Sequence, residues 1–187
     1  VVACATVLLG TLYPLLVDAL GGGKLSVGPP YFDAVFTPLM FPALFLMGVA
    51  PFARWKEARA SELARLLRWA FLSAAAVGLI APFFFGAWKP LVALSLVLAA
   101  WIVAGSLLNL FSRARSTRKD QSLAAALLGQ PRSFLGMHLA HIGIAVFVVG
   151  VALVNGYQAE KDVKMAVGDT VTLKDYTFVF NGIREEK

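Results

Sequence analysis

The chain of 187 residues lacks most of the residue sets on which common enzyme chemistry depends. Its one cysteine, Cys4, excludes an internal disulfide framework and a metal site made of several cysteines. Because Cys4 lies in an apolar run, we interpret it as a small hydrophobic residue of a helix. The sequence also lacks a Walker motif, an HExxH motif and a Ser/His/Asp set in one region. Motifs therefore assign no catalytic residue, and the catalytic set is left unknown.

Charged residues are also scarce, at 15% of the chain, whereas hydrophobic residues make up 59%. A soluble domain has about 25% charged and about 45–50% apolar residues, so this composition excludes an ordinary water-soluble core. The chain is predicted to be a multi-spanning membrane protein with the lipid bilayer as a partner. The formal net charge is +6, but the basic residues lie between apolar runs, which indicates membrane orientation and no nucleic-acid partner.

Five apolar runs have about the length that a membrane-spanning helix needs, roughly 20 residues. They lie near residues 1–18, 34–53, 69–86, 90–111 and 134–154. Prolines within these runs are expected to kink the helices and not to break them, because neighbouring helices can satisfy the freed backbone groups. They are Pro14, Pro38, Pro42 and Pro82. The fold predicted for residues 1–154 is an all-α polytopic membrane helix bundle of about five transmembrane helices.

Residues 155–187 have a different pattern. Apolar and polar residues alternate around Val171 and Leu173, and again from Tyr176 to Phe180. Gly168-Asp169 and Lys174-Asp175 are candidate turns, and Asn181-Gly182 is a stronger one. This segment is predicted to be the start of a small periplasmic β domain. Because the sequence begins inside an apolar run and ends in a charged one, we expect it to be part of a longer protein.

Lys and Arg are distributed unequally over the connections. Ten lie in the loops near 54–68 and 112–133, and two lie in the loop 19–33 and the turn 86–90. The rule that cytoplasmic loops are rich in Lys and Arg places the first two loops in the cytoplasm, and the loop 19–33 and the tail 155–187 outside. The loop 54–68 is either a short amphipathic helix at the membrane surface or a solvated basic connector. Residues 122–128 are predicted to form a short surface helix.

His138 and His141 are the only histidines, and they are the only ionisable side chains in the run 134–154. An ionisable residue at membrane depth indicates function by default. Three interpretations of His141 remain open from the residues alone: a structural hydrogen bond to a neighbouring helix, a proton relay, or a ligand of metal or haem iron. Small residues surround it and leave room for close helix packing or a flat cofactor. They are Gly136, Ala140, Gly143, Ala145 and Gly150.

The loop 21–33 is the second candidate site. It contains three successive glycines, and then Gly28, Pro29, Pro30 and Tyr31. Glycines allow the backbone to approach a ligand, and the prolines stiffen the residues after them. The pattern is not a phosphate-binding loop. On physical grounds it is either a re-entrant connector with an aromatic anchor or part of a binding surface outside the membrane.

Several of these runs together resemble the CcmF family, the large integral-membrane component of the bacterial cytochrome c haem lyase. In chain order they are Leu-Leu-Gly-Thr-Leu-Tyr-Pro at 8–14, Ser-Val-Gly-Pro-Pro-Tyr-Phe-Asp at 26–33, Pro-Leu-Met at 38–40, Ala-His-Ile-Gly-Ile-Ala-Val at 140–146 and Glu-Lys-Asp-Val-Lys-Met at 160–165. The resemblance covers nearly the whole chain and corresponds to the C-terminal part of the family.

The resemblance implies a function and a cofactor. Family members attach haem covalently to the CxxCH thiols of apocytochrome c in the periplasm, and a membrane haem b keeps the substrate haem reduced. His141 matches one axial ligand of haem b, so it would be the only iron ligand in this chain. His138 does not match a ligand, and we interpret it as a neighbour of the site. Gly28, Pro29, Pro30 and Tyr31 would lie near the substrate face.

Further partners and the location are also implied by the resemblance. The implied partners are haem, apocytochrome c, the haem chaperone CcmE, and lyase components of the CcmH and CcmI types, all at the bacterial inner membrane. The tryptophan-rich segment that cradles substrate haem in the family, and the other histidine ligands, are absent from this sequence. We therefore expect no activity from this chain alone. Two alternatives stay open: a fragment of a secondary transporter or proton-translocating protein with His141 as the relay, and a structural scaffold.

Overall fold

A computed structural model describes residues 1–25, 27–52, 60–117 and 122–183 of the chain. These residues form six α-helices, two short 3-10 helices and one antiparallel pair of strands. In chain order the elements are α1 (Val2–Ala19), α2 (Pro29–Val49), η1 (Ala50–Phe52), α3 (Ala60–Ile80), η2 (Ala81–Phe84), α4 (Pro90–Thr117), α5 (Leu123–Leu128), α6 (Arg132–Tyr157), β1 (Thr170–Leu173) and β2 (Tyr176–Val179).

Five of the helices are long and apolar enough to cross a membrane, which confirms the predicted bundle. The candidate spans are Val2–Ala19, Ala34–Phe52, Leu63–Phe84, Pro90–Thr117 and Arg132–Tyr157. The chain is thus a multi-pass membrane protein. The short helix expected at 122–128 is present as α5, and the Ser122 hydroxyl caps it by accepting a hydrogen bond from the Ala125 amide at 3.2 Å.

The helices extend beyond the predicted apolar runs. Helix α3 begins at Ala60, so residues 60–68 belong to a transmembrane helix and not to a separate loop; residues 54–59 lie outside the described residues. Helix α4 continues to Thr117, past its basic residues. Arginine and serine are compatible with helix, and a run of apolar residues marks only the part that meets hydrocarbon. The sequence therefore predicted the spans well and the helix ends poorly.

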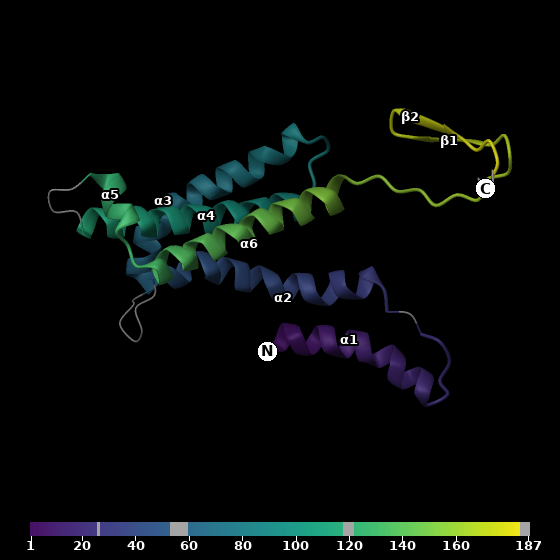
Figure 1. The fold of residues 1–187 in the computed structure, drawn as a ribbon, viewed down its shortest axis with the longest axis horizontal. Coiled ribbons are helices and arrows are strands. Elements are labelled where there is room, and N and C mark those ends of the chain that lie inside the picture. Colours follow the sequence, from purple (N-terminus) through teal and green to yellow (C-terminus); the bar gives the residue numbers. More distant parts are fainter. Residues whose placement is uncertain (26, 53–59, 118–121, 184–187) are drawn as a thin grey trace.

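Helix α4 is the centre of the bundle (Figure 1). It packs against α2, α3 and α6, whereas α1 lies at one edge beside α2. Half of the most apolar stretch of α4 is buried inside the bundle, whereas the buried share is 6% to 22% for the other four spans. One core cluster joins α2, α4 and α6 through Leu44, Leu98, Ala99, Ile102 and Ala145. A second cluster joins α3 to α4 through Leu67, Ala74 and Trp101.

Glycine allows α2 and α4 to touch. A methyl group added at Gly105 of α4 would lie 2.6 Å from the carbonyl oxygen of Gly48 of α2. Real side chains do not approach backbone so closely, so both positions require the smallest residue. Such close approach is how membrane helices gain packing energy when hydrocarbon surrounds them on all sides.

The prolines behave in two ways. Helix α2 continues through Pro38 and Pro42, and α1 continues through Pro14, as predicted. Pro82, in contrast, lies in η2, directly after α3 ends at Ile80. A proline lacks the amide hydrogen that an α-helix needs, so the last turn changes to 3-10 geometry. The Trp88 indole donates a hydrogen bond to the Leu79 carbonyl there, at 3.3 Å.

The tail forms a β-hairpin beyond one end of the bundle (Figure 1). Val171 pairs with Phe178 and Leu173 pairs with Tyr176, so the predicted alternation places these four side chains on one face. The chain reverses at Lys174-Asp175, and Lys174 adopts a φ of 52°. Asn181-Gly182, the turn that the sequence favoured, lies after β2 and joins no strands in the described residues. A hairpin alone is marginal in water.

Candidate functional site

His141 lies inside α6, where one ring nitrogen has a defined partner. Its Nδ1 lies 2.7 Å from the carbonyl oxygen of Met137, one turn earlier in the same helix. A carbonyl oxygen can only accept a hydrogen bond, so Nδ1 carries a proton and Nε2 is left clear of this bond. The ring is half-buried. The bond from Nδ1 to Met137 fixes the orientation of the ring, and Nε2 is the nitrogen of His141 that could bind a metal.

His138 has a different role because it is buried and hydrogen-bonded across the bundle. Only 1% of its surface is exposed, and its Nε2 lies 3.2 Å from Oδ1 of Asn109 on α4. The amide of Asn109 donates in turn to the carbonyl oxygen of Pro51 in η1, at 3.2 Å. Because the amide nitrogen is the donor there, Oδ1 accepts, and the proton of His138 lies on Nε2.

This chain of hydrogen bonds joins three segments that are far apart in the sequence. It ties the start of α6 to the end of α4 and to the turn after α2. Nδ1 of His138 is buried and has no hydrogen-bond partner among the described residues. The same is true of Oγ of Ser106 on α4. Both nitrogens of His138 thus lie in the helix interface, and neither is directed to the bundle surface. Its contacts are those of a structural residue beside the candidate site.

The two imidazoles lie close together without forming a joint site. Their ring centroids are 6.5 Å apart and the ring planes are inclined by 53°. The edge of the Phe134 ring packs against His138 at 4.6 Å, and the Arg113 guanidinium lies 4.4 Å above Phe134. In the described residues, no group of three or more histidine, cysteine or acidic side chains could hold a metal ion. A six-coordinate iron at His141 would need its other ligand from outside these residues.

Small residues lie on the surface of α6 that faces away from the bundle. Added methyl groups at Gly136, Gly143 and Gly150 would meet nothing within 4 Å in the described residues. Ala140 is exposed on the same side. Ala145 is the exception, because it is buried in the core with Leu98 and Ile102. Four of the five small residues therefore share one exposed face of α6 with Phe147, and this face lies on the opposite side of the helix from His141.

The second candidate segment forms the start of a helix and not a free loop. Gly28 is the N-cap residue of α2 with extended backbone, and Pro29 begins the helix. Proline is favoured at this position because its fixed φ suits a helix and no amide hydrogen is needed there. The Tyr31 hydroxyl donates to the carbonyl oxygen of Thr6 on α1, at 3.4 Å. The Gly-Pro-Pro-Tyr segment therefore ties α1 to α2.

The structure does not bring the two candidate segments together. Helix α2 begins at the end of the bundle where α6 finishes, so Tyr31 lies toward the hairpin end (Figure 1). His141 lies in the first half of α6, toward the opposite end. A function that uses both segments would therefore involve groups at two different depths in the membrane.

The amino-acid sequence of the chain is similar to those of known proteins. The chain is 40% identical over 184 residues to the cytochrome c-type biogenesis protein CcmF of Pseudomonas fluorescens, and 98% of the chain is covered. It is 36% identical to CcmF of Escherichia coli over 187 residues, with 99% of the chain covered. It is also 35% identical to the cytochrome c-type biogenesis protein CycK of Rhizobium meliloti, with 98% covered.

The chain matches the C-terminal part of CcmF. It spans 27% of the length of each of these relatives. The resemblance predicted from the sequence is thereby confirmed, and it supports a role in cytochrome c maturation. No family model matches the chain. No solved structure matches it either.

Sequence reasoning missed two residues that shape this part of the helix bundle. Asn109 is the only amide side chain in the apolar run 90–111, and that isolation was the signal for a buried hydrogen bond. Trp101 is 2% exposed and packs between α2, α3 and α4. A tryptophan in the middle of an apolar run has no periodic signature, so its place was not predictable from the pattern.

Proposed function

We propose that this chain is part of a membrane haem lyase that attaches haem to the CxxCH thiols of apocytochrome c in the periplasm. The observation that carries the proposal is the hydrogen bond from Nδ1 of His141 to the Met137 carbonyl oxygen at 2.7 Å, which orients the ring and leaves Nε2 clear for a ligand role. An imidazole arranged in this way inside an apolar helix suits an axial position of haem iron. The similarity to cytochrome c-type biogenesis proteins supports this choice over a proton relay.

The residues present fit one half of a haem b site. His141 offers Nε2 as a ligand atom on a half-buried ring inside an apolar helix, whereas the glycine positions of α6 lie on the other side of that helix. His138 does not suit the role of the other ligand, because its ring is buried between α6 and α4 and lies on the same helix as His141. A haem held there would supply electrons that keep the iron of the substrate haem ferrous. The other axial ligand and most contacts with the substrate haem would come from the rest of the protein.

The residues of this chain would keep the ligand side chain and the helices around it in place. Met137 keeps His141 in one tautomer and one orientation, so little reorganisation is needed when iron binds. The His138–Asn109–Pro51 hydrogen bonds hold α6 against α4 beside that site. Gly28, Pro29, Pro30 and Tyr31 begin α2 at the hairpin end, where we propose that they form part of the surface facing the substrate.

The proposed setting is the bacterial inner membrane, with the start of α3 and the segment between α4 and α6 at its cytoplasmic face. The start of α2, the turn after η2 and the β-hairpin then lie in the periplasm, where residues 155–187 begin a β domain. Apocytochrome c, haem, the haem chaperone CcmE, and CcmH- and CcmI-type components are the proposed partners. His141 then lies nearer the cytoplasmic side, and the Gly-Pro-Pro-Tyr segment lies at the periplasmic side.

Optical spectroscopy of the full-length protein tests the proposal. The purified protein should show a Soret band that His141→Ala removes. His138→Gln is the matched control, because it changes the neighbouring histidine and keeps an amide for hydrogen bonding with Asn109. A colourless wild-type protein after expression with ample haem would contradict the proposal. A Soret band retained in His141→Ala would contradict the assignment of this ligand.

A further inference from the structure

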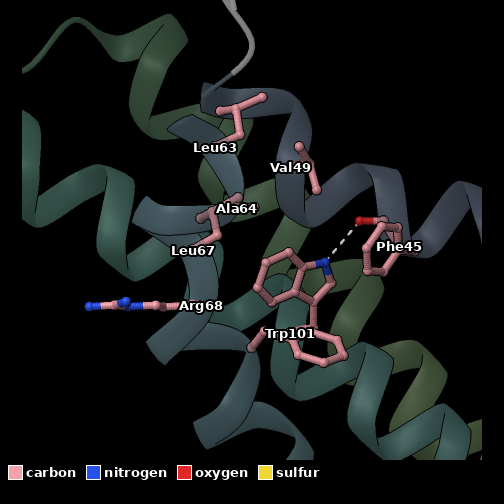
Figure 2. A pocket seen from close by; sticks show the side chains of 8 residues that line it. Phe45, Val49, Leu63, Ala64, Leu67, Arg68 and Trp101 are labelled. Atoms are coloured by element: carbon pink, nitrogen blue, oxygen red, sulfur yellow. Dashed lines mark hydrogen bonds between the residues drawn. The ribbon is translucent and has the colours of Figure 1, made fainter. Parts of the chain in front are cut away.

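An apolar groove runs between α2, α3 and α4, and no residue of α6 is among its described lining residues (Figure 2). Its volume is about 450 Å³, and its walls include Phe45 and Val49 of α2, Leu67 and Phe71 of α3, and Trp101 of α4. Small-molecule sites have volumes of about 300–1,000 Å³, so the groove is large enough for a molecule and is more than a packing defect.

Trp101 makes the floor of the groove rigid and apolar. Its Nε1 donates to the carbonyl oxygen of Phe45 at 2.8 Å, so its one polar atom is already bonded within the protein (Figure 2). The indole stacks on the Phe45 ring at 5.8 Å, and Phe71 meets it edge-on at 5.5 Å. The rings therefore offer only carbon to an occupant, and no group of this floor can bind iron or hydrogen-bond a polar ligand.

Positive charge lies at the mouth of the groove. Among the described residues, Arg68 is the only charged residue that lines it, and the side chain extends away from Trp101 (Figure 2). Its guanidinium lies 5.3 Å from the ring of Trp69, which is 68% exposed. Arg65 is exposed one turn earlier on α3. Neither guanidinium has an ion-pair partner among the described residues, so both can bind an anion from outside.

The position along the span indicates the level of this charge in the membrane. The candidate span of α3 begins at Leu63, so Arg65 and Arg68 lie within its first two turns. Arginine there directs its head toward the lipid phosphates while its stem lies along hydrocarbon. A tryptophan beside it is typical of the membrane interface. Leu63 and Ala64, nearer the start of the span than Arg68, also line the groove. The site thus combines an apolar groove with two cations beside it near one end of the span.

We propose that this groove binds one acyl chain of an anionic phospholipid, with the lipid phosphate against Arg68 and Arg65. The shape and apolar lining select a hydrocarbon chain, and the cations select a negative head group. The inference goes beyond the proposed haem chemistry and does not depend on it. It assigns to α3 a lipid-binding role at the end of the bundle where that helix begins.

Native mass spectrometry of the detergent-solubilised full-length protein tests this, with phosphatidylglycerol and phosphatidylcholine titrated separately. Wild type should retain phosphatidylglycerol in preference to phosphatidylcholine. One basic residue near the membrane surface contributes about a fivefold difference in affinity, so Arg68→Gln should weaken phosphatidylglycerol binding about fivefold. Arg65→Gln together with Arg68→Gln should remove the preference. Arg115→Gln, an exposed arginine in the last turn of α4, is the control with the same charge change and should have no effect.

Ala64→Phe tests the groove itself. Ala64 lines it, so the larger side chain should occupy the space and weaken binding of both lipids. If this variant does not accumulate as folded protein, the arginine variants decide alone, because they change only exposed side chains. Equal retention of both lipids by wild type would overturn the proposal. A phosphatidylglycerol preference that survives in the double arginine variant would also overturn it. The same holds if another part of the full-length protein fills the groove and the protein retains no lipid.

Discussion

The hydrogen bonds of Asn109 make the most quantitative prediction. Asn109→Ala removes two bonds of 3.2 Å, one from Nε2 of His138 and one to the carbonyl oxygen of Pro51. Hydrogen bonds between membrane helices contribute about 0.6 kcal/mol on average and about 1.7 kcal/mol at most. The loss also leaves a buried imidazole N–H without a partner, which costs about 1–3 kcal/mol. We expect the free energy of unfolding to fall by about 1–3 kcal/mol.

The cost of the unpaired imidazole can be separated from the cost of the lost bonds. His138→Leu removes the imidazole, so adding Asn109→Ala to it should cost much less than Asn109→Ala does alone. The coupling energy of the two changes should be at least about 0.5 kcal/mol. SDS-induced unfolding of the full-length protein in mixed micelles measures each variant. Asn155→Ala, an exposed amide near the end of α6, is the control and should change stability by less than about 0.5 kcal/mol.

Two results would refute this reasoning. Additivity of the two changes within about 0.3–0.5 kcal/mol would mean that Asn109 and His138 do not interact. A loss of the Soret band in Asn109→Ala, with unfolding unchanged, would mean that Asn109 acts on a cofactor and not on helix packing.

Three further predictions concern other parts of the chain. Gly105→Ala should destabilise the bundle by about 1–3 kcal/mol in the same unfolding assay, because the methyl group meets the Gly48 carbonyl, whereas Gly136→Ala, with nothing within 4 Å, should not. Tyr31→Ala should lower the yield of haem-stained cytochrome c without lowering the b-haem Soret band; loss of both together would indicate a folding defect. Lys174 donates to the Tyr157 carbonyl at 2.9 Å, so Lys174→Ala should speed proteolysis of the 158–169 connection, and an unchanged rate, equal to that of Lys164→Ala, would show that this bond does not hold the hairpin.

The fold was largely predictable because hydrocarbon imposes a simple pattern. Each apolar run near 20 residues became a transmembrane helix, and the alternation at Val171 and Leu173 became a strand. The helix ends were not predictable in this way, since the extension of α3 back to Ala60 and of α4 to Thr117 uses basic and polar residues. The start of α2 at Pro29 could have been predicted, because proline is favoured at the first position of a helix. The interpretation of residues 21–33 as a loop overlooked this signal.

The candidate site was predictable in its location but not in its division of roles. Spacing placed His138 and His141 on neighbouring turns, and could not tell which imidazole is bonded across the bundle. That distinction depends on Asn109 of α4 and the Met137 carbonyl, which are tertiary and backbone contacts. The lipid groove depends likewise on the meeting of three helices around Trp101, and no local pattern in the sequence indicates it.

The central claim is that Nε2 of His141 binds haem iron inside the membrane, and chemical rescue of the full-length protein tests it most directly. His141→Gly removes the imidazole and leaves a space of similar shape in α6. We predict that the low-spin haem spectrum is lost in this variant and returns when free imidazole is added, but not when pyrrole, which offers no lone pair for iron, is added at the same concentration. A low-spin spectrum in His141→Gly identical to that of wild type, before any imidazole is added, would contradict the claim.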